Sequence, residues 1–503
     1  MQRGRFRPAA LALATGIALV VAVSVACYFR VMNDTSAASN DSIMSGSSTN
    51  RENSRTRREP PLWKGIKTSK NYTNVEWTAG SEHNLLQIVT KNKVPVVISN
   101  GPGMMWGEVS SKWNMQQLFG SDTDNDLVIL PQCRKHISPL FVLEREKDKG
   151  GMIGQESHTP VQYADISLSE FLKSMKENDR YLYWTGLLSQ LTAYSAGRSI
   201  SHKEFVSRPK IGDLSRTHWQ EFHVLEPELA EGLPLPTDDF WEPMLWFSQP
   251  GVVAQTHFDS QHNFFTVIFG VRHFTFFSPS LEMHPYPSIH RSNRQSQLHL
   301  ELEDDASILT KQLHNATDSS DSSHSLTFQI DVAAGQTLYI PPYWYHHVET
   351  LSPSLGVSVN SPSREEAILQ QAYWHTVPLG GFRTSPQRMS AAKYFLDLLV
   401  RNVCNISVQQ FAEGLYLSRF SILFPHESTD CGFLECEPET ISSEAIAKFT
   451  TTADSISSII EASTVTADIK KIFLSDYVEQ MSRWAVGPNY TASYIYCCLT
   501  AIS

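Results

Sequence analysis

The sequence predicts a mainly β protein with helices: a β core, a helical C-terminal part and an N-terminal transmembrane helix. Aromatic and β-branched runs are densest between residues 243 and 278, which is typical of strands. After residue 363, apolar residues recur at spacings of three and four, which is typical of helices. The chain has 503 residues, 41% of them hydrophobic and 18% charged, so it can bury a large core and form several domains.

Residues 1–30 predict a short cytosolic stub followed by a transmembrane signal anchor. Arg3, Arg5 and Arg7 precede an uncharged apolar run over residues 8–29, and about 20 apolar residues suffice to cross a bilayer as a helix. Basic charge on the N-terminal side orients such a helix with its N-terminus in the cytosol. We therefore expect a type II single-pass membrane protein whose body is lumenal or extracellular, in the secretory pathway. A cleaved signal peptide, giving a secreted protein, and a mitochondrial targeting segment are the alternatives.

Residues 31–60 are rich in Ser, Thr, Asn and Arg and have no apolar periodicity, which predicts a flexible stem. The secretory expectation also fits the N-glycosylation sequons, which would make the chain a glycoprotein. These begin at Asn33, Asn40, Asn71, Asn315, Asn405 and Asn489. Cysteines gather near the C-terminus, which suits disulfides in an oxidising lumen, although unpaired structural thiols fit the pattern equally well. They are Cys404, Cys431, Cys436, Cys497 and Cys498.

The globular body begins near residue 61 with alternating strand and helix signals. Residues 94–99 form a short β-branched run that ends in a turn signal. Residues 166–180 carry apolar side chains at helical spacing, and the aromatic run 181–184 after them predicts a strand.

Two aromatic and β-branched runs, residues 263–269 and 272–277, lie on either side of Gly270-Val271 and predict a β-hairpin. Residues 299–325 are polar and acidic, and we expect an exposed connection there. Strand character resumes over residues 335–342, just before a His-His pair.

The C-terminal part is predicted to be helical. The domain scheme assigns residues 363–425 to a helical, possible dimerisation part and residues 426–503 to a helical tail of unknown role. The segments with helical spacing are residues 391–403, 408–420, 444–460 and 469–484.

The residues with the clearest chemistry are His257, Asp259 and a later histidine, His346 or His347. Residues two apart at a strand project to the same side, so His257 and Asp259 can contact one ion. Two imidazoles and one carboxylate form the facial triad that binds non-heme Fe(II) and leaves coordination positions open. Adjacent strand residues face opposite ways, so only one of His346 and His347 can be the third ligand.

These motifs resemble the Jumonji C (cupin-like) Fe(II)/2-oxoglutarate dioxygenase family. Within that family they are closest to the asparaginyl hydroxylase that inhibits hypoxia-inducible factor. The resemblance implies a double-stranded β-helix of the jelly-roll type over residues 61–362, with Fe(II), 2-oxoglutarate and O2 as cofactors and cosubstrates. The matching segments are residues 257–259 with Gln261, 263–265 and Gly270; 285–287; 294–297; and 335–341 leading into 344–349.

The resemblance also implies a role for individual residues. The implied metal ligands are His257, Asp259 and His346. The implied 2-oxoglutarate contacts are Tyr181, Asn263, Arg272 and Asn360, and the implied substrate contacts are Gln261, Arg294 and Gln295. No catalytic residue beyond the metal ligands is implied. One position departs from the pattern, because Ala254 replaces a threonine hydroxyl that contacts 2-oxoglutarate in the related enzyme.

By this resemblance the reaction is hydroxylation of a protein side chain, with Asn, Asp or His as the expected target. The alternatives are an N-methyl-lysine demethylase and a low-turnover cupin-like binding or scaffold module. The partners expected are a protein or peptide substrate, the membrane and a second copy of the chain, which would pair through residues 363–425. The net charge of −11 argues against a general nucleic-acid binder.

Overall fold

The structure is a computed structural model. It describes residues 73–76, 89, 93–99, 126–136, 162–174, 181–195, 197–201, 204, 244–288, 290, 292–300, 303–317, 326–424, 431–432, 434, 436, 439–462 and 465–500. Among these residues, no helix is both long and apolar enough to cross a membrane. The predicted anchor and stem, and the sequons at Asn33, Asn40 and Asn71, lie outside the described residues.

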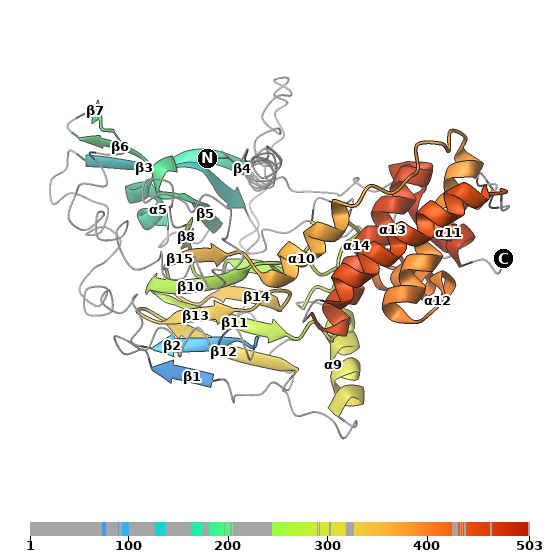
Figure 1. The fold of residues 1–503 in the computed structure, drawn as a ribbon. Helices are drawn as coiled ribbons and strands as arrows, with labels where there is room; N and C mark the ends of the chain where they lie inside the picture. The colour runs from blue at the N-terminus through green and yellow to red at the C-terminus, as the bar shows by residue number, and fades with distance from the viewer. Residues whose placement is uncertain are drawn as a thin grey trace, which may run out of the picture. The chain divides into compact units, whose positions relative to one another are not determined.

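Two β-sheets form the core of the part that the structure describes (Figure 1). The larger sheet has the order β1 (Thr73–Glu76), β2 (Val96–Ser99), β13 (Thr337–Ile340), β10 (His262–Phe269), β15 (Ser354–Ser361), β8 (Met244–Ser248), β5 (Tyr181–Leu187), β3 (Asp126–His136), β6 (Thr192–Ser195) and β7 (Arg198–Ser199), with β4 (Gln162–Ser167) paired to β3. The smaller sheet has the order β12 (Thr327–Ala333), β11 (Val271–Phe277), β14 (Tyr345–Thr350) and β9 (Val253–His257).

The strands from β8 to β15 are divided between the two sheets. β8, β10, β13 and β15 belong to the larger sheet, whereas β9, β11, β12 and β14 belong to the smaller one. Side chains from both sheets meet in one apolar cluster, including Phe265 and Leu338 from the larger sheet and Phe274, Phe276 and Phe328 from the smaller one. Burying each such side chain stabilises the fold by about 1.5–3 kcal/mol, so this cluster holds the two sheets together.

The predicted hairpin around Gly270 is wrong. β10 pairs with β13 and β15, whereas β11 pairs with β12 and β14, so the chain changes sheets at Gly270. Gly270 has a φ of +86°, and a Cβ there would collide with the carbonyl oxygen of Pro353. A single glycine is also shorter than the two-residue loop that a tight hairpin needs.

The exposed connection expected at residues 299–325 instead contains a helix, α9 (Glu303–Thr317), whose Leu309 is fully buried.

The predicted helices are confirmed. α5 (Leu168–Ser174) lies within the predicted residues 166–180, and the longer helices begin at capping residues that include Thr384, Ser442 and Thr466. The C-terminal elements are α10 (Arg364–Tyr373), α11 (Ser385–Cys404), α12 (Val408–Leu415), η5 (Tyr416–Phe420), α13 (Ser443–Glu461), α14 (Ala467–Val486), η7 (Pro488–Tyr490), α15 (Thr491–Ser493) and η8 (Tyr494–Leu499); the short η3 (Leu188–Gln190) follows β5.

The C-terminal helices share one apolar core with the β core. Phe258 and Tyr345 from the β core belong to the same cluster as Phe395 on α11, Phe449 on α13 and Tyr477 on α14. The apolar faces of α11 and α12 are thus buried within the chain itself. The pairing of two copies through these faces stays a prediction, and the helices that cover the faces would have to move to allow it.

Two disulfides close the C-terminal part: Cys431–Cys497 and Cys436–Cys498. They tie the segment before α13 to η8, at sequence separations of 66 and 62 residues. Among the described cysteines, Cys133 and Cys404 are unpaired. Loops of this length restrict the unfolded chain strongly, so each bond stabilises the helical part.

Replacing Cys431 and Cys436 by serine is therefore expected to lower the free energy of unfolding by about 2–4 kcal/mol. Urea unfolding followed by circular dichroism measures this, with Cys404→Ser as the control that leaves both bonds intact. Equal unfolding midpoints for the oxidised wild type, the reduced wild type and the double variant would contradict the assignment.

Candidate metal centre

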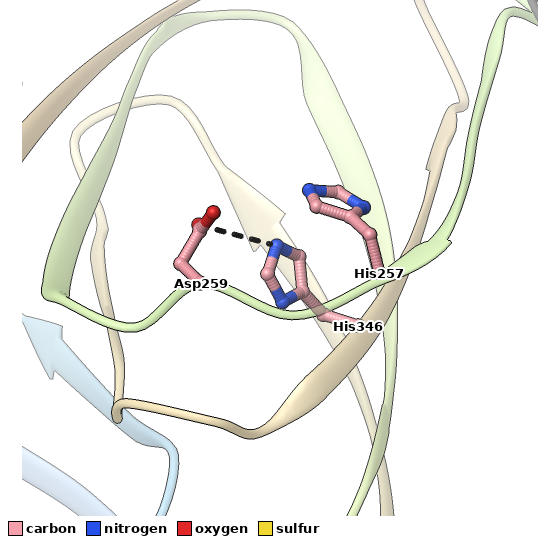
Figure 2. A group of neighbouring side chains, drawn as sticks. All are labelled: His257, Asp259 and His346. Atoms are coloured by element: carbon pink, nitrogen blue, oxygen red, sulfur yellow. Dashed lines mark ion pairs between the residues drawn. The ribbon is translucent and has the colours of Figure 1, made fainter. Parts of the chain in front are cut away.

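Three side chains from two neighbouring strands converge at one end of the smaller sheet (Figure 2). His257 is the last residue of β9, Asp259 follows it in the connection to β10, and His346 is the second residue of β14. β9 and β14 are antiparallel and place His257 opposite His346. One ligand atom from each of the three lies within 4.8 Å of the others. The strand register therefore builds a cluster with two nitrogens and one oxygen.

Both imidazoles are oriented by backbone carbonyls. His257 Nδ1 donates to the carbonyl oxygen of Gln255 at 2.7 Å, and His346 Nδ1 donates to that of Trp344 at 3.1 Å. A carbonyl oxygen only accepts, so Nδ1 carries the proton in each ring and Nε2 keeps its lone pair. Such hydrogen bonds to the distal ring nitrogen are typical of metal-ligating histidines.

The electrostatics of the cluster favour the protonation states of metal ligands. Burial opposes ionisation of Asp259, but His346, His257 and Arg294 outweigh it, and the pKa of the carboxyl lies below its ordinary value. Burial and the neighbouring His257 lower the pKa of His346 to about 4, although Asp259 opposes this. At neutral pH the site therefore presents an anionic carboxylate beside a neutral imidazole, as a divalent metal requires.

The surroundings of the cluster fit an Fe(II)-type ion with further ligands. His346 Nε2 and Asp259 Oδ2 are 3.9 Å apart, the pair joined by the dashed line in Figure 2. Asn263 Nδ2 donates to Asp259 Oδ2 at 3.4 Å, and its own Oδ1 is buried without a hydrogen-bond partner. A buried carbonyl oxygen usually has a hydrogen-bond partner, so Asn263 Oδ1 fits a site that binds a further polar group. Two imidazoles and one carboxylate match the facial-triad donor set.

His347 lies on the opposite face of β14. It is paired with Thr275 on β11, and its Nδ1 lies 3.4 Å from Thr256 Oγ1. Burial lowers the pKa of His347 to about 3, so its ring is neutral. The geometry thus brings His346, and not His347, to Asp259.

The two asparagines predicted to contact 2-oxoglutarate are cross-strand neighbours. Asn263 on β10 is directly opposite Asn360 on β15, so both side chains are on one face of the larger sheet. Asn263 is buried, whereas Asn360 is exposed. Gln261, a predicted substrate contact, is half-buried immediately before β10.

Arg272 is a buried cation that bridges the two sheets. From β11 it donates through Nε to Ser354 Oγ at 2.9 Å and through Nη2 to Ser248 Oγ at 2.7 Å and to the Trp246 carbonyl oxygen at 2.8 Å. Burial lowers its pKa to about 10, and Tyr183 partly offsets this. Within the described residues, no carboxylate forms a salt bridge with it. A buried cation without a counter-charge is unfavourable unless an anion joins it.

The neighbours of Arg272 include residues that the sequence did not indicate. Tyr183, two residues after the predicted Tyr181, acts electrostatically on Arg272. Residues two apart on a strand share a face, so the aromatic run contained this signal. Ser248 and Ser354 carried no such signal, because only the fold brings β8 and β15 to Arg272. Tyr181 itself lies against Gly251.

Arg294 and Gln295 lie beside the metal strand. Gln295 forms a β-bridge with His257, and the carbonyl oxygen of Arg294 accepts from the backbone N–H of Phe258 at 3.1 Å. The side chain of Arg294 is exposed and lines a cavity next to Asp259. Ala254 lies opposite Val348 and packs against the apolar cluster.

Comparisons with known proteins identify the domain family. The chain matches the model of the cupin-like domain family over residues 83–376, more than half of its length. It is also similar to the JmjC domain-containing protein D of Dictyostelium discoideum, with 26% identity over 112 residues. That match covers 22% of this chain and 23% of the length of the relative. The metal cluster lies inside the family match, whereas α11 to α14 lie outside it.

Removing one ligand is expected to abolish tight metal binding. His346→Ala should weaken Fe(II) or Co(II) binding roughly a hundredfold or more, because even residues that only support ligands contribute about 10–100-fold. Anaerobic titration followed by calorimetry measures the affinity. His347→Gln is the matched control, and equal loss of affinity in both variants would contradict the assignment of His346.

Proposed function

The chain belongs to the cupin-like, JmjC-type domain family, and from that premise we propose that it is an Fe(II)- and 2-oxoglutarate-dependent dioxygenase that hydroxylates a protein side chain. Members of this family are generally 2-oxoglutarate-dependent oxygenases, and demethylases belong to the same superfamily. The observation that carries the proposal is the convergence of His257, Asp259 and His346. An Asn, Asp or His target is the finer expectation.

We also propose that the two sheets form a double-stranded β-helix of the jelly-roll type. The division of β8 to β15 between the sheets supports this, because the chain passes repeatedly from one sheet to the other around one apolar cluster. Such a scaffold is rigid where the ligands sit. His257 and His346 are fixed by paired strands, and the tight connection after β9 fixes Asp259.

In the proposed reaction the protein positions groups rather than reacting itself. Bound Fe(II) would activate O2, with 2-oxoglutarate as the co-reductant that is converted to succinate and CO2. His257, Asp259 and His346 would hold the ion, and a triad of this kind leaves coordination positions open for the cosubstrate and O2. Asn263 donates a hydrogen bond to Asp259 and so helps to orient this ligand.

Arg272 is the proposed partner for the far carboxylate of 2-oxoglutarate. Its burial and its lack of an acidic partner among the described residues support this role, because a carboxylate would neutralise the charge. The hydroxyls of Ser248 and Ser354 accept hydrogen bonds from the guanidinium of Arg272. Tyr181 and Tyr183 lie on β5, the strand that pairs with β8. Ala254 offers no hydroxyl, so Arg272 would carry more of the affinity than in the related hydroxylase.

A secretory location with an N-terminal anchor is proposed for the same enzyme. Two disulfides support it, because such bonds persist in oxidising compartments and are rare in the cytosol. The sequons at Asn405 and Asn489 are exposed, so both could accept a glycan. A lumenal site would act on secretory or extracellular proteins.

The oxygenase proposal is tested by uncoupled turnover. Purified full-length protein is loaded anaerobically with Fe(II) and 2-oxoglutarate and then exposed to air, and succinate is quantified. Release should require both additions and should disappear in His346→Ala. Absence of both 2-oxoglutarate binding and succinate release in the folded wild type would favour the scaffold alternative.

Arg272→Gln is expected to raise the KM for 2-oxoglutarate roughly tenfold to a hundredfold while kcat at saturation changes little, because the lost contact is a charged hydrogen bond to the cosubstrate. Arg401→Gln removes the same charge from an exposed helix position and serves as the control. Thermal unfolding of each variant checks that it is folded. An unchanged KM in folded Arg272→Gln would place the carboxylate elsewhere.

A further inference from the structure

A cavity of about 170 Å³ lies beside the chain segment that carries Asp259. Phe258 and Ser260, which flank the ligand Asp259, form one side of it. The other side is formed by α10 and α14, which lie side by side (Figure 1) and are joined by a ring contact between Tyr373 and Phe473. A substrate side chain placed here would contact the residues on either side of the proposed ligand Asp259.

The wall supplied by α14 is a feature of this chain beyond the family match. Phe473 and Asp476 line the cavity, and both lie outside residues 83–376. Tyr373 packs on α14 by stacking with Tyr477 and by its edge contact with Phe473. The C-terminal tail, for which the sequence indicated no role, therefore forms part of the surroundings of the site.

Tyr343 points to a ligand in this cavity. It is 6% exposed and stacks on Phe258 with 5.6 Å between ring centroids. Its backbone has a φ of +65°, an uncommon value for a bulky residue, and its N–H donates to the Asp259 carbonyl oxygen at 2.7 Å. Its side chain lines the cavity, yet its hydroxyl makes no hydrogen bond with any residue that the structure describes. A tyrosine hydroxyl at a cavity wall can donate to or accept from a ligand there.

The charged groups around that hydroxyl are predominantly acidic. Glu366, Asp476 and Arg294 act on it, and all three line the cavity. Asp476 is paired with Arg419 at 2.5 Å, but Arg419 is shared with the fully buried Glu479 at 2.7 Å. Burial raises the pKa of Glu479, and Asp476 is the carboxylate that α14 presents to the cavity.

The remaining charged side chains at the cavity are Glu366 and Arg294. Glu366 on α10 accepts from Ser260 Oγ at 2.9 Å, a neutral donor that leaves its charge in place. Arg294, which also lines the cavity, acts electrostatically on Asp259. The side formed by α10 and α14 carries the carboxylates of Glu366 and Asp476 and is bordered by the rings of Tyr343, Tyr373 and Phe473. Carboxylates beside aromatic rings are the surroundings that organic cations prefer.

We propose that this cavity recognises a basic side chain, lysine or arginine, of the protein substrate. The inference rests on the proposed function for the nature of the partner, and Glu366 and Asp476 are its specificity-determining residues. The cation would contact both carboxylates and donate to the Tyr343 hydroxyl oxygen. Tyr373, 36% exposed, stands at the mouth where the peptide would enter.

The proposal is tested by peptide binding without turnover. Full-length protein with Fe(II) and 2-oxoglutarate is kept anaerobic, and fluorescent pools of short peptides are compared by anisotropy. The pools differ only in a fixed central residue: Lys, Arg, Met, Gln or Glu. Lys and Arg pools should bind roughly tenfold more tightly than the neutral pools, and the Glu pool most weakly. Glu366→Gln and Asp476→Asn should each remove most of this preference.

The control is Glu461→Gln, which removes the same charge from the exposed end of α13 and should keep the preference. Asp476 also pairs with Arg419, so thermal unfolding is measured for every variant. Glu366→Gln gives an independent reading, because an amide oxygen can still accept from Ser260. Equal binding of all peptide pools would overturn the proposal. Tighter binding of the Glu pool, with that preference lost in Arg294→Gln, would overturn it as well.

Succinate release without peptide, measured on the same proteins, separates this proposal from the oxygenase function. Succinate release by a protein that binds all peptide pools equally would overturn only the proposal that the cavity recognises a basic side chain. A charge preference that depends on Glu366 and Asp476, without any succinate release, would overturn only the oxygenase.

Discussion

The pairing of β9 with β14 is the constraint on which the candidate site depends. Their antiparallel register sets His257 opposite His346, and the turn after β9 returns Asp259 to the same point. Because strand side chains alternate, a slip by one residue would replace His346 with His347 and dismantle the cluster. The carbonyl oxygens that orient the two imidazoles belong to the same strand ends, so register, tautomer and ligand geometry are set together.

The C-terminal helices complete this arrangement from the other side. Glu479 on α14 accepts from the backbone N–H of Ser288, and Gln297 donates to the carbonyl oxygen of Arg419. These contacts tie the segment that carries Arg294 to the C-terminal helices, and the β-bridge between Gln295 and His257 ties the same segment to β9. Arg419 and Glu479 are both buried, and losing one partner of a buried ion pair costs about 3–5 kcal/mol. The tail therefore supports the site as well as covering the core.

Local patterns in the sequence predicted much of this structure. The spacing of His257 and Asp259, and the choice of His346 by resemblance, led to residues that the fold brings together. Helical spacing located α11 and α13 correctly, because amphipathic periodicity is a local property. Features set by distant contacts were missed. The strands around Gly270 belong to different sheets. The pairing of Cys431 with Cys497 and the approach of Asp476 to Phe258 and Ser260 depend on the packing of α14 and η8.

The most direct test of the central claim is an anaerobic crystal structure with Fe(II) and 2-oxoglutarate, in which anomalous scattering locates the metal. The account predicts one iron bound by His257 Nε2, His346 Nε2 and an Asp259 carboxylate oxygen, with the far carboxylate of 2-oxoglutarate paired to Arg272. Iron bound through His347 or at another cluster, or a cosubstrate carboxylate remote from Arg272, would contradict it.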